Sequence, residues 1–249
     1  MGILTPPLTL GYQNRAQEMA DEALRLGLDH SSFLIRVEAP MYAAAFHGQN
    51  RLFDRAYEIN QQALALAEEY DFSVGLALSD MRLGSLRACR GEAMGVAQIQ
   101  KGVEAWRASG SSVAAPAFLG LLAEGCIGAR DRETGLAAVI EGLAESRATR
   151  SAHNDAELHR MHGDLLVLDD HDAARRAAEA AYQRAIDAAR AQGAKAWELR
   201  AALALGKLWH TEGRGTEARA LVSEVYEWFE DGSATPDLRD AKALLQELA

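Results

Sequence analysis

The feature that most constrains the fold is a motif of small residues that returns about every 40 residues. In each copy, two small residues flank a larger one at positions i, i+4 and i+7, which lie on one face of a helix. The first small residue of each copy is, in chain order, Ala16, Ala56, Gly95, Gly135, Ala178 and Ala218. Successive members are separated by 40, 39, 40, 43 and 40 residues. Such a period indicates an array of one supersecondary unit, in which each copy packs on its neighbours.

A further small residue, about twelve positions upstream of the motif, marks the first helix of each unit. It is found at Ala44, Gly84, Ala123, Gly163 and Gly206. Between Gly163 and Ala178 the spacing is three residues longer, where Asp169-Asp170-His171-Asp172 predicts a longer turn. Each unit is therefore expected to be a pair of helices that approach closely where the small residues meet.

Turn-forming residues divide the chain into the units of this array. The expected limits are a half repeat over 12–29, full repeats over 32–70, 72–109, 112–150, 153–193 and 195–230, and a capping helix over 235–248. Thr235 is the expected N-cap of that last helix, with Pro236 at its first helical position. Its apolar stripe is suited to covering the exposed end of the last repeat.

The N-terminal unit lacks a first helix in this division. Too few residues precede its turn at Gly11 to form one, so the chain is expected to begin in the middle of a repeat. Two explanations stay open, a fragment of a longer protein or an atypical N-terminal cap.

Composition agrees with an all-α chain. Apolar residues make up 49% of the sequence and there are five Pro, while Ala and Leu, which dominate the apolar share, are strong helix formers. We therefore predict an all-α, right-handed helical-repeat solenoid with about 40 residues per repeat and a C-terminal capping helix.

Charge and cysteine content exclude several classes of partner and site. The formal net charge of −10 repels phosphate groups, which argues against direct contact with nucleic acid or an anionic membrane. Cys89 and Cys126 have neither the spacing of a zinc site nor that of a disulfide framework. With no signal-peptide pattern and no apolar run of about 18 residues, the sequence predicts a cytoplasmic protein with two buried free thiols.

The residues Gly206, Trp209, Gly213, Ala218 and Val222 resemble the tetratricopeptide repeat (TPR). The units here are longer than the about 34 residues of that repeat, and they lack its terminal Pro. The resemblance implies a TPR-like solenoid that works by binding other molecules.

A wider resemblance is carried by the stretches 102–110, 156–163, 197–202 and 225–229 together with 235–238. They are similar to the C-terminal arm of multidomain bacterial regulators that contain a class III nucleotide cyclase domain or a predicted ATPase domain. The resemblance implies a bacterial sensory or scaffolding arm in signal transduction.

Candidate binding residues occupy the outward positions of the first helices, which line the concave face of such an array. They are Arg82, Glu124, Glu157, Arg160, Asp164, Arg200, Lys207 and His210. Arg160 and Arg200 could hold a carboxylate or phosphate of a guest in bidentate fashion. Alternatively, Glu157 and Arg160 form an ordinary helix pair, while Glu198 and Arg200 bridge neighbouring repeats.

Motifs for catalysis or cofactor binding are absent from the sequence. No GxxxxGK[ST], GxGxxG or GxSxG occurs, and His159 and His162 are better explained as packed or surface histidines than as metal ligands. We expect no enzyme activity, no cofactor and no metal.

The function expected from the sequence is a non-catalytic scaffold that binds a protein segment or small ligand on its concave face. The alternative is a structural module that forms a homodimer through its open N-terminal end.

Overall fold

A computed structural model describes residues 13–92, 94–108, 115–229 and 235–249. The expected turn at Gly11, the expected limits at 12, 109, 112 and 230, and the start of the open N-terminal end lie outside these ranges.

The described residues are helical almost throughout and contain no strand. The prediction of an all-α helical-repeat solenoid is confirmed. The helices are α2 (Gln13–Leu28), α3 (Phe33–Gln49), α4 (Phe53–Glu69), α5 (Ser73–Cys89), α6 (Met94–Ala108), α7 (Ala115–Ala129), α8 (Arg132–Thr149), α9 (Asp155–Leu166), α10 (Asp172–Ala191), α11 (Lys195–Thr211), α12 (Gly215–Tyr226) and α13 (Pro236–Glu247), with a short 3₁₀ turn at Ala152–Asn154 before α9.

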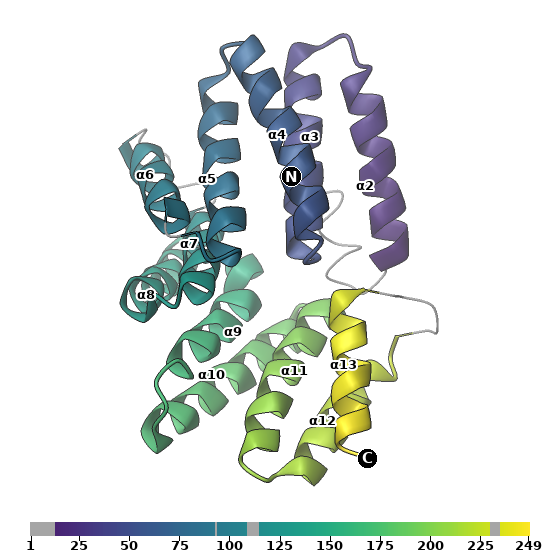
Figure 1. Cartoon of the computed structure of the whole chain (residues 1–249), viewed down its shortest axis with the longest axis vertical. Helices are drawn as coiled ribbons and strands as arrows, with labels where there is room; N and C mark the ends of the chain where they lie inside the picture. Colours follow the sequence, from purple (N-terminus) through teal and green to yellow (C-terminus); the bar gives the residue numbers. More distant parts are fainter. Residues whose placement is uncertain (1–12, 93, 109–114, 230–234) are drawn as a thin grey trace.

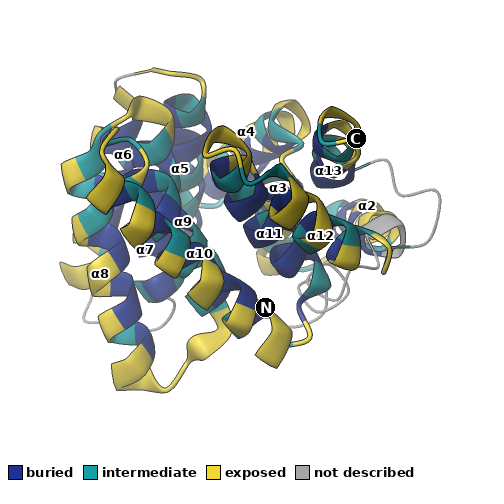
Figure 2. Cartoon of the chain, turned by 90° about the horizontal axis from the view of Figure 1, so that it is seen from below, coloured by how far each residue is buried: buried dark blue, intermediate teal, exposed yellow. Residues whose placement is uncertain are grey.

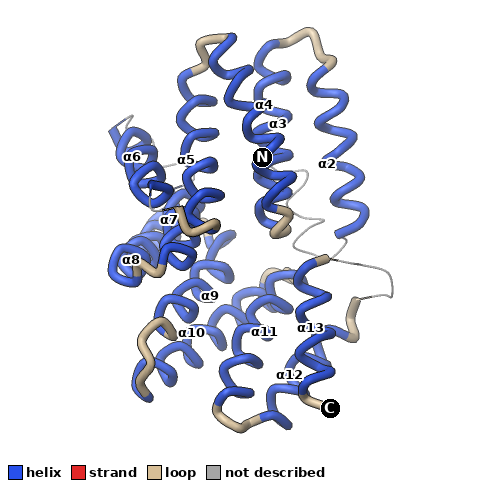
Figure 3. Tube along the Cα trace, in the orientation of Figure 1, coloured by secondary structure: helices blue, strands red, loops and turns tan. Residues whose placement is uncertain are grey.

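Successive helices pack as antiparallel hairpins joined by short turns (Figure 3). We propose that α3/α4, α5/α6, α7/α8, α9/α10 and α11/α12 are the repeat units. In Figure 1, α2 to α5 fill the upper half of the molecule, α9 to α13 fill the lower half, and α6 to α8 connect the two halves on one side. The array is curved so strongly that α13 returns to the lower end of α3.

Small residues set the distance between helices of a hairpin. A Cβ atom added to Gly163 on α9 would lie 2.3 Å from Tyr182 on α10, and one added to Gly206 would lie 2.8 Å from Val222. Real Cβ atoms essentially never come so close. These two glycines, inside the first helices of their hairpins, therefore let a large side chain of the second helix lie directly on the backbone.

The interior is a row of apolar clusters along the array. Buried residues face the neighbouring helices and exposed residues face outward (Figure 2). The largest cluster runs from α5 to α9, and the next runs from α9 to α13. Ala56, Ala178 and Ala218, which open the repeating motif, are fully buried. Stability is therefore distributed over neighbouring contacts along the chain, as expected for a solenoid.

The C-terminal helix α13 covers the end of the last hairpin. Thr235 accepts a hydrogen bond from the N–H of Leu238, with Pro236 at the start of the helix. Leu238, Ala241 and Leu244 are buried against α11 and α12. None of the helices in the described ranges has the length and hydropathy needed to cross a bilayer.

We predict that Gly95→Ala lowers the free energy of unfolding by about 1–3 kcal/mol, although Ala favours a helix. The added Cβ would lie 2.5 Å from the backbone of Gly84 and Ala88 on α5, which cannot move aside as a side chain can. Urea denaturation measures the change. Gly120→Ala is the matched control, since its Cβ meets nothing closer than 3.8 Å and should be neutral or stabilising by up to about 1 kcal/mol. Equal effects of the two substitutions would contradict this account of the close approach.

Candidate functional site

A cleft of about 1220 Å³ lies on the inner side of the curve. Its walls come from the turn after α3 and the start of α4, from the end of α5, from α7, from α9 to α11, and from the start of α13. The cleft is far larger than a water site and somewhat larger than the about 300–1,000 Å³ of typical small-molecule sites, so it has room for a small ligand or a short peptide segment. Five of the predicted binding residues line it: Glu124, Arg160, Asp164, Arg200 and Lys207.

Three charged residues on α9 form the first part of the site. Glu157, Arg160 and Asp164 are spaced i, i+3 and i+7, so they share one face of the helix. Arg160 donates to both carboxylate oxygens of Glu157, at 3.0 and 3.1 Å, and also to Asp164. Tyr182 on α10 donates its hydroxyl to Asp164 at 2.9 Å. The α9 carboxylates are thus held by groups of the same hairpin.

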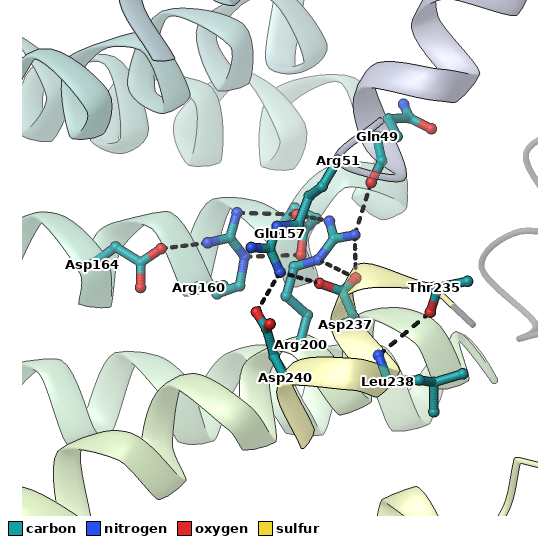
Figure 4. Close-up of polar contacts among 10 residues, drawn as sticks. All are labelled: Gln49, Arg51, Glu157, Arg160, Asp164, Arg200, Thr235, Asp237, Leu238 and Asp240. Carbon is teal, nitrogen blue, oxygen red and sulfur yellow. Dashed lines mark hydrogen bonds and ion pairs between the residues drawn. The ribbon is translucent and has the colours of Figure 1, made fainter. Parts of the chain in front are cut away.

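Arg200 on α11 joins this group to the C-terminal helix. Its Nη1 donates to Glu157 at 2.9 Å, while Nε and Nη2 donate to Asp237 at 3.0 and 2.7 Å. Nη2 also donates to the backbone carbonyl of Gln49, at the end of α3, at 2.7 Å. One guanidinium group therefore connects three parts of the chain that are more than 35 residues apart (Figure 4).

A second arginine, Arg51, completes the connection from the turn between α3 and α4. It lies in the left-handed region with φ 60°, and its Nη1 donates to Asp237 at 3.0 Å and to Asp240 at 2.7 Å. Both carboxylates belong to the first turns of α13, where negative charge is also favoured by the helix dipole. We call Arg51, Glu157, Arg160, Asp164, Arg200, Asp237 and Asp240 the arginine–carboxylate network.

Burial makes these contacts strong. The side chains of Arg160, Arg200 and Glu157 are 11%, 14% and 14% exposed, and that of Asp237 is 4% exposed. Burial by itself would raise the pKa of Glu157 and Asp237, but the neighbouring guanidinium groups outweigh it, so both pKa values lie below the usual range. The carboxylates are therefore ionised at neutral pH and stay bound to the arginines.

Among the predicted binding residues that line the cleft, Glu124 and Lys207 differ from Arg160, Asp164 and Arg200. Among the described residues, neither side chain has a hydrogen bond or ion pair within the chain. Burial raises the pKa of Glu124, although Arg160 and Arg200 oppose the rise. One anionic and one cationic group thus face the cleft without an internal partner.

Three of the predicted residues do not line the cleft. Glu157 contacts the arginines without lining the cleft. Arg82 donates to the backbone carbonyl of Met41, and burial lowers its pKa to about 10. His210 is exposed outside the cleft.

The guanidinium groups of Arg160 and Arg200 are occupied by carboxylates of the chain itself, so a guest's carboxylate would compete with them. Glu198 pairs with Arg190 and Lys195 and so links α10 to α11. These contacts agree with the alternative interpretation of the sequence, in which Glu157 and Arg160 form a helix pair while Glu198 and Arg200 bridge neighbouring repeats.

Sequence reasoning missed Arg51, Asp237, Asp240 and Tyr182 as members of the site. Arg51 and Asp237 are separated by 186 residues, and a repeat pattern gives contacts only between neighbours. The acidic first turn of the last helix was visible in the sequence, but it is equally explained by favourable interaction with the helix N-terminus.

Metal binding has no support in the described part of the chain, where no group of three or more His, Cys, Asp or Glu side chains has a suitable arrangement. His159 and His162 are half-buried, and burial lowers the pKa of each. Cys89, in the cleft wall, and the buried Cys126 are free thiols.

No protein-family model matches the chain, and no curated protein matches it by sequence. Comparison of the fold with solved structures does find a similar protein. A Rap protein complexed with Competence and Sporulation Factor is similar in structure, with a TM-score of 0.69 and 12% sequence identity. The match covers 96% of this chain and 74% of the Rap chain. The fold is that of a TPR-like helical-repeat protein. The likeness shows the fold alone.

We predict that Arg200→Met lowers the free energy of unfolding by about 2–4 kcal/mol, because it removes the shared partner of two buried carboxylates. Urea denaturation measures the change. The matched control is Arg107→Met, whose pair with Glu141 is about half exposed on both sides and should contribute at most about 1 kcal/mol. If the two variants lose the same stability, the network does not hold the structure together.

Proposed function

We propose that this chain is a non-catalytic scaffold that binds a protein segment in its cleft. The observation that carries the proposal is a large cleft that Glu124 and Lys207 line with one anionic and one cationic group, neither of them bound within the described part of the chain. A peptide suits such a cleft because it offers both amide groups and charged side chains along its length.

The likeness to a Rap protein in complex with Competence and Sporulation Factor supports a binding role for the same fold. The described residues carry no metal-binding group, and every carboxylate of the network is bound to arginine. Recognition by shape and charge is therefore the mechanism that we propose.

We propose further that the chain acts in the bacterial cytoplasm as the regulatory arm of a signalling protein. The support is the resemblance of the stretches 102–110 and 156–163 to the arms of bacterial cyclase and ATPase regulators. The same resemblance suggests that the guest is a segment of another signalling protein, with a small ligand as the alternative.

The proposal is tested with peptides selected from a phage-displayed random library against the wild-type chain. A selected peptide, labelled with fluorescein, is titrated with wild type, Glu124→Ala and Lys207→Ala, and its fluorescence anisotropy is followed. We expect at least one of the two variants to bind about five- to fiftyfold more weakly. Lys101→Ala, on the exposed surface of α6, is the matched control and should bind as wild type does.

Two results would contradict the proposal. One is a library that yields no peptide with saturable binding. The other is a set of peptides that bind both cleft variants as tightly as the wild-type chain, which would place their site elsewhere.

A further inference from the structure

The contact between the two ends of the array differs in kind from the contacts between neighbouring repeats. Neighbouring helices share buried apolar side chains along their whole length. The turn after α3 meets α13 through side-chain hydrogen bonds of Arg51 and Arg200. The apolar residues of α13 are turned the other way, into the cluster with α11 and α12.

The Arg51 contacts lie at the surface. The side chains of Arg51 and Asp240 are 38% and 36% exposed, whereas that of Asp237 is 4% exposed. Exposed ion pairs are weak and are screened by salt, while the buried pair of Arg200 and Asp237 is screened much less. Closure of the array therefore depends on the exposed Arg51 contacts and on the exposed hydrogen bond from Arg200 to the Gln49 carbonyl, which are weaker than the apolar contacts within each half.

The same residues form one wall of the cleft. Arg51, Asp237 and Asp240 line it together with Phe53, the first residue of α4. A movement that separates the turn after α3 from α13 would widen the cleft on that side, without breaking any of the apolar clusters in the described residues.

From this arrangement we infer that Arg51, with Asp237 and Asp240, is a salt-sensitive latch that controls access to the cleft. The inference rests on the proposed function, because it concerns entry to the proposed binding site. In the closed form the latch joins the first and last parts of the array. When it is released, the two halves separate by bending along the row of repeats, and a guest enters from the side of α13.

Release of the latch leaves no buried charge unpaired. Asp237 keeps its two hydrogen bonds from Arg200, and Asp240 becomes solvated. Loss of the Arg51 side chain is therefore compatible with a folded protein. Loss of Arg200 is different, because Arg200 donates hydrogen bonds to two buried carboxylates, Glu157 and Asp237.

Cys89 offers a direct measure of access, because it lies in the cleft wall, whereas Cys126 is fully buried in the core. The experiment compares the rates at which N-ethylmaleimide labels the two thiols of the full chain, resolved by mass spectrometry. The variant is Arg51→Asn, since Asn tolerates the left-handed backbone of this position. The matched control is Arg150→Asn, another exposed arginine with positive φ at a helix end.

We expect Arg51→Asn to raise the labelling rate of Cys89 about two- to fivefold, and Asp240→Asn to raise it less, since Asp237 then still holds Arg51. In the wild type, about 1 M NaCl should raise the rate similarly, whereas Arg51→Asn should respond little to salt. Labelling of Cys126 should stay unchanged, which separates opening of the cleft from unfolding. The loss of the positive charge of Arg51 would by itself lower the labelling rate of Cys89, because removing a cation raises the pKa of a nearby thiol and slows its reaction.

The latch would be overturned if Cys89 is labelled at the same rate in Arg51→Asn, Arg150→Asn and wild type at low salt. It would also be overturned if Arg51→Asn raises the labelling rate of Cys126 as much as that of Cys89. The measurement uses no guest. If the latch responds as expected while no peptide binds, the latch stands and the proposed function fails. If peptides bind at the cleft while Cys89 labelling does not respond, the proposed function stands and the latch fails.

Discussion

The closed shape of this protein depends on the guanidinium group of Arg200. It binds Glu157 of the preceding hairpin, Asp237 of the C-terminal helix and the carbonyl of Gln49 at the end of α3. A planar group with five donors can satisfy several acceptors at once, which an ammonium group cannot do with the same geometry. Loss of Arg200 would leave Glu157 with Arg160 alone and Asp237 with Arg51 alone, so two buried carboxylates would each lose one of their two arginine partners.

The network acts on a chain that is otherwise built from neighbouring contacts. Glycines and alanines bring the helices of each hairpin close together, and the resulting small rotation between repeats curves the array. Curvature brings residues 49–51 near the start of α13, and the arginines connect them. The cleft thus lies between repeat helices, and the charged contacts of Arg51, Asp237 and Asp240 form part of its wall.

The sequence was sufficient to predict the helical repeats, because periodic small residues such as Gly163 and Gly206 reflect packing against the next helix in the chain. It also singled out Glu157, Arg160 and Arg200, which lie at outward positions of the first helices. It could not identify Arg51 as their partner. That contact depends on the total curvature of the array, the sum of many small rotations that no local pattern records.

The central claim, that charged contacts close the array, is tested most directly by small-angle X-ray scattering of the wild-type chain at about 0.05 M and about 1 M NaCl. We predict that the low-salt curve agrees with the one calculated from the closed structure, and that high salt increases the radius of gyration while far-ultraviolet circular dichroism stays constant. An open, extended particle at low salt, or a radius of gyration that does not respond to salt, would contradict the account.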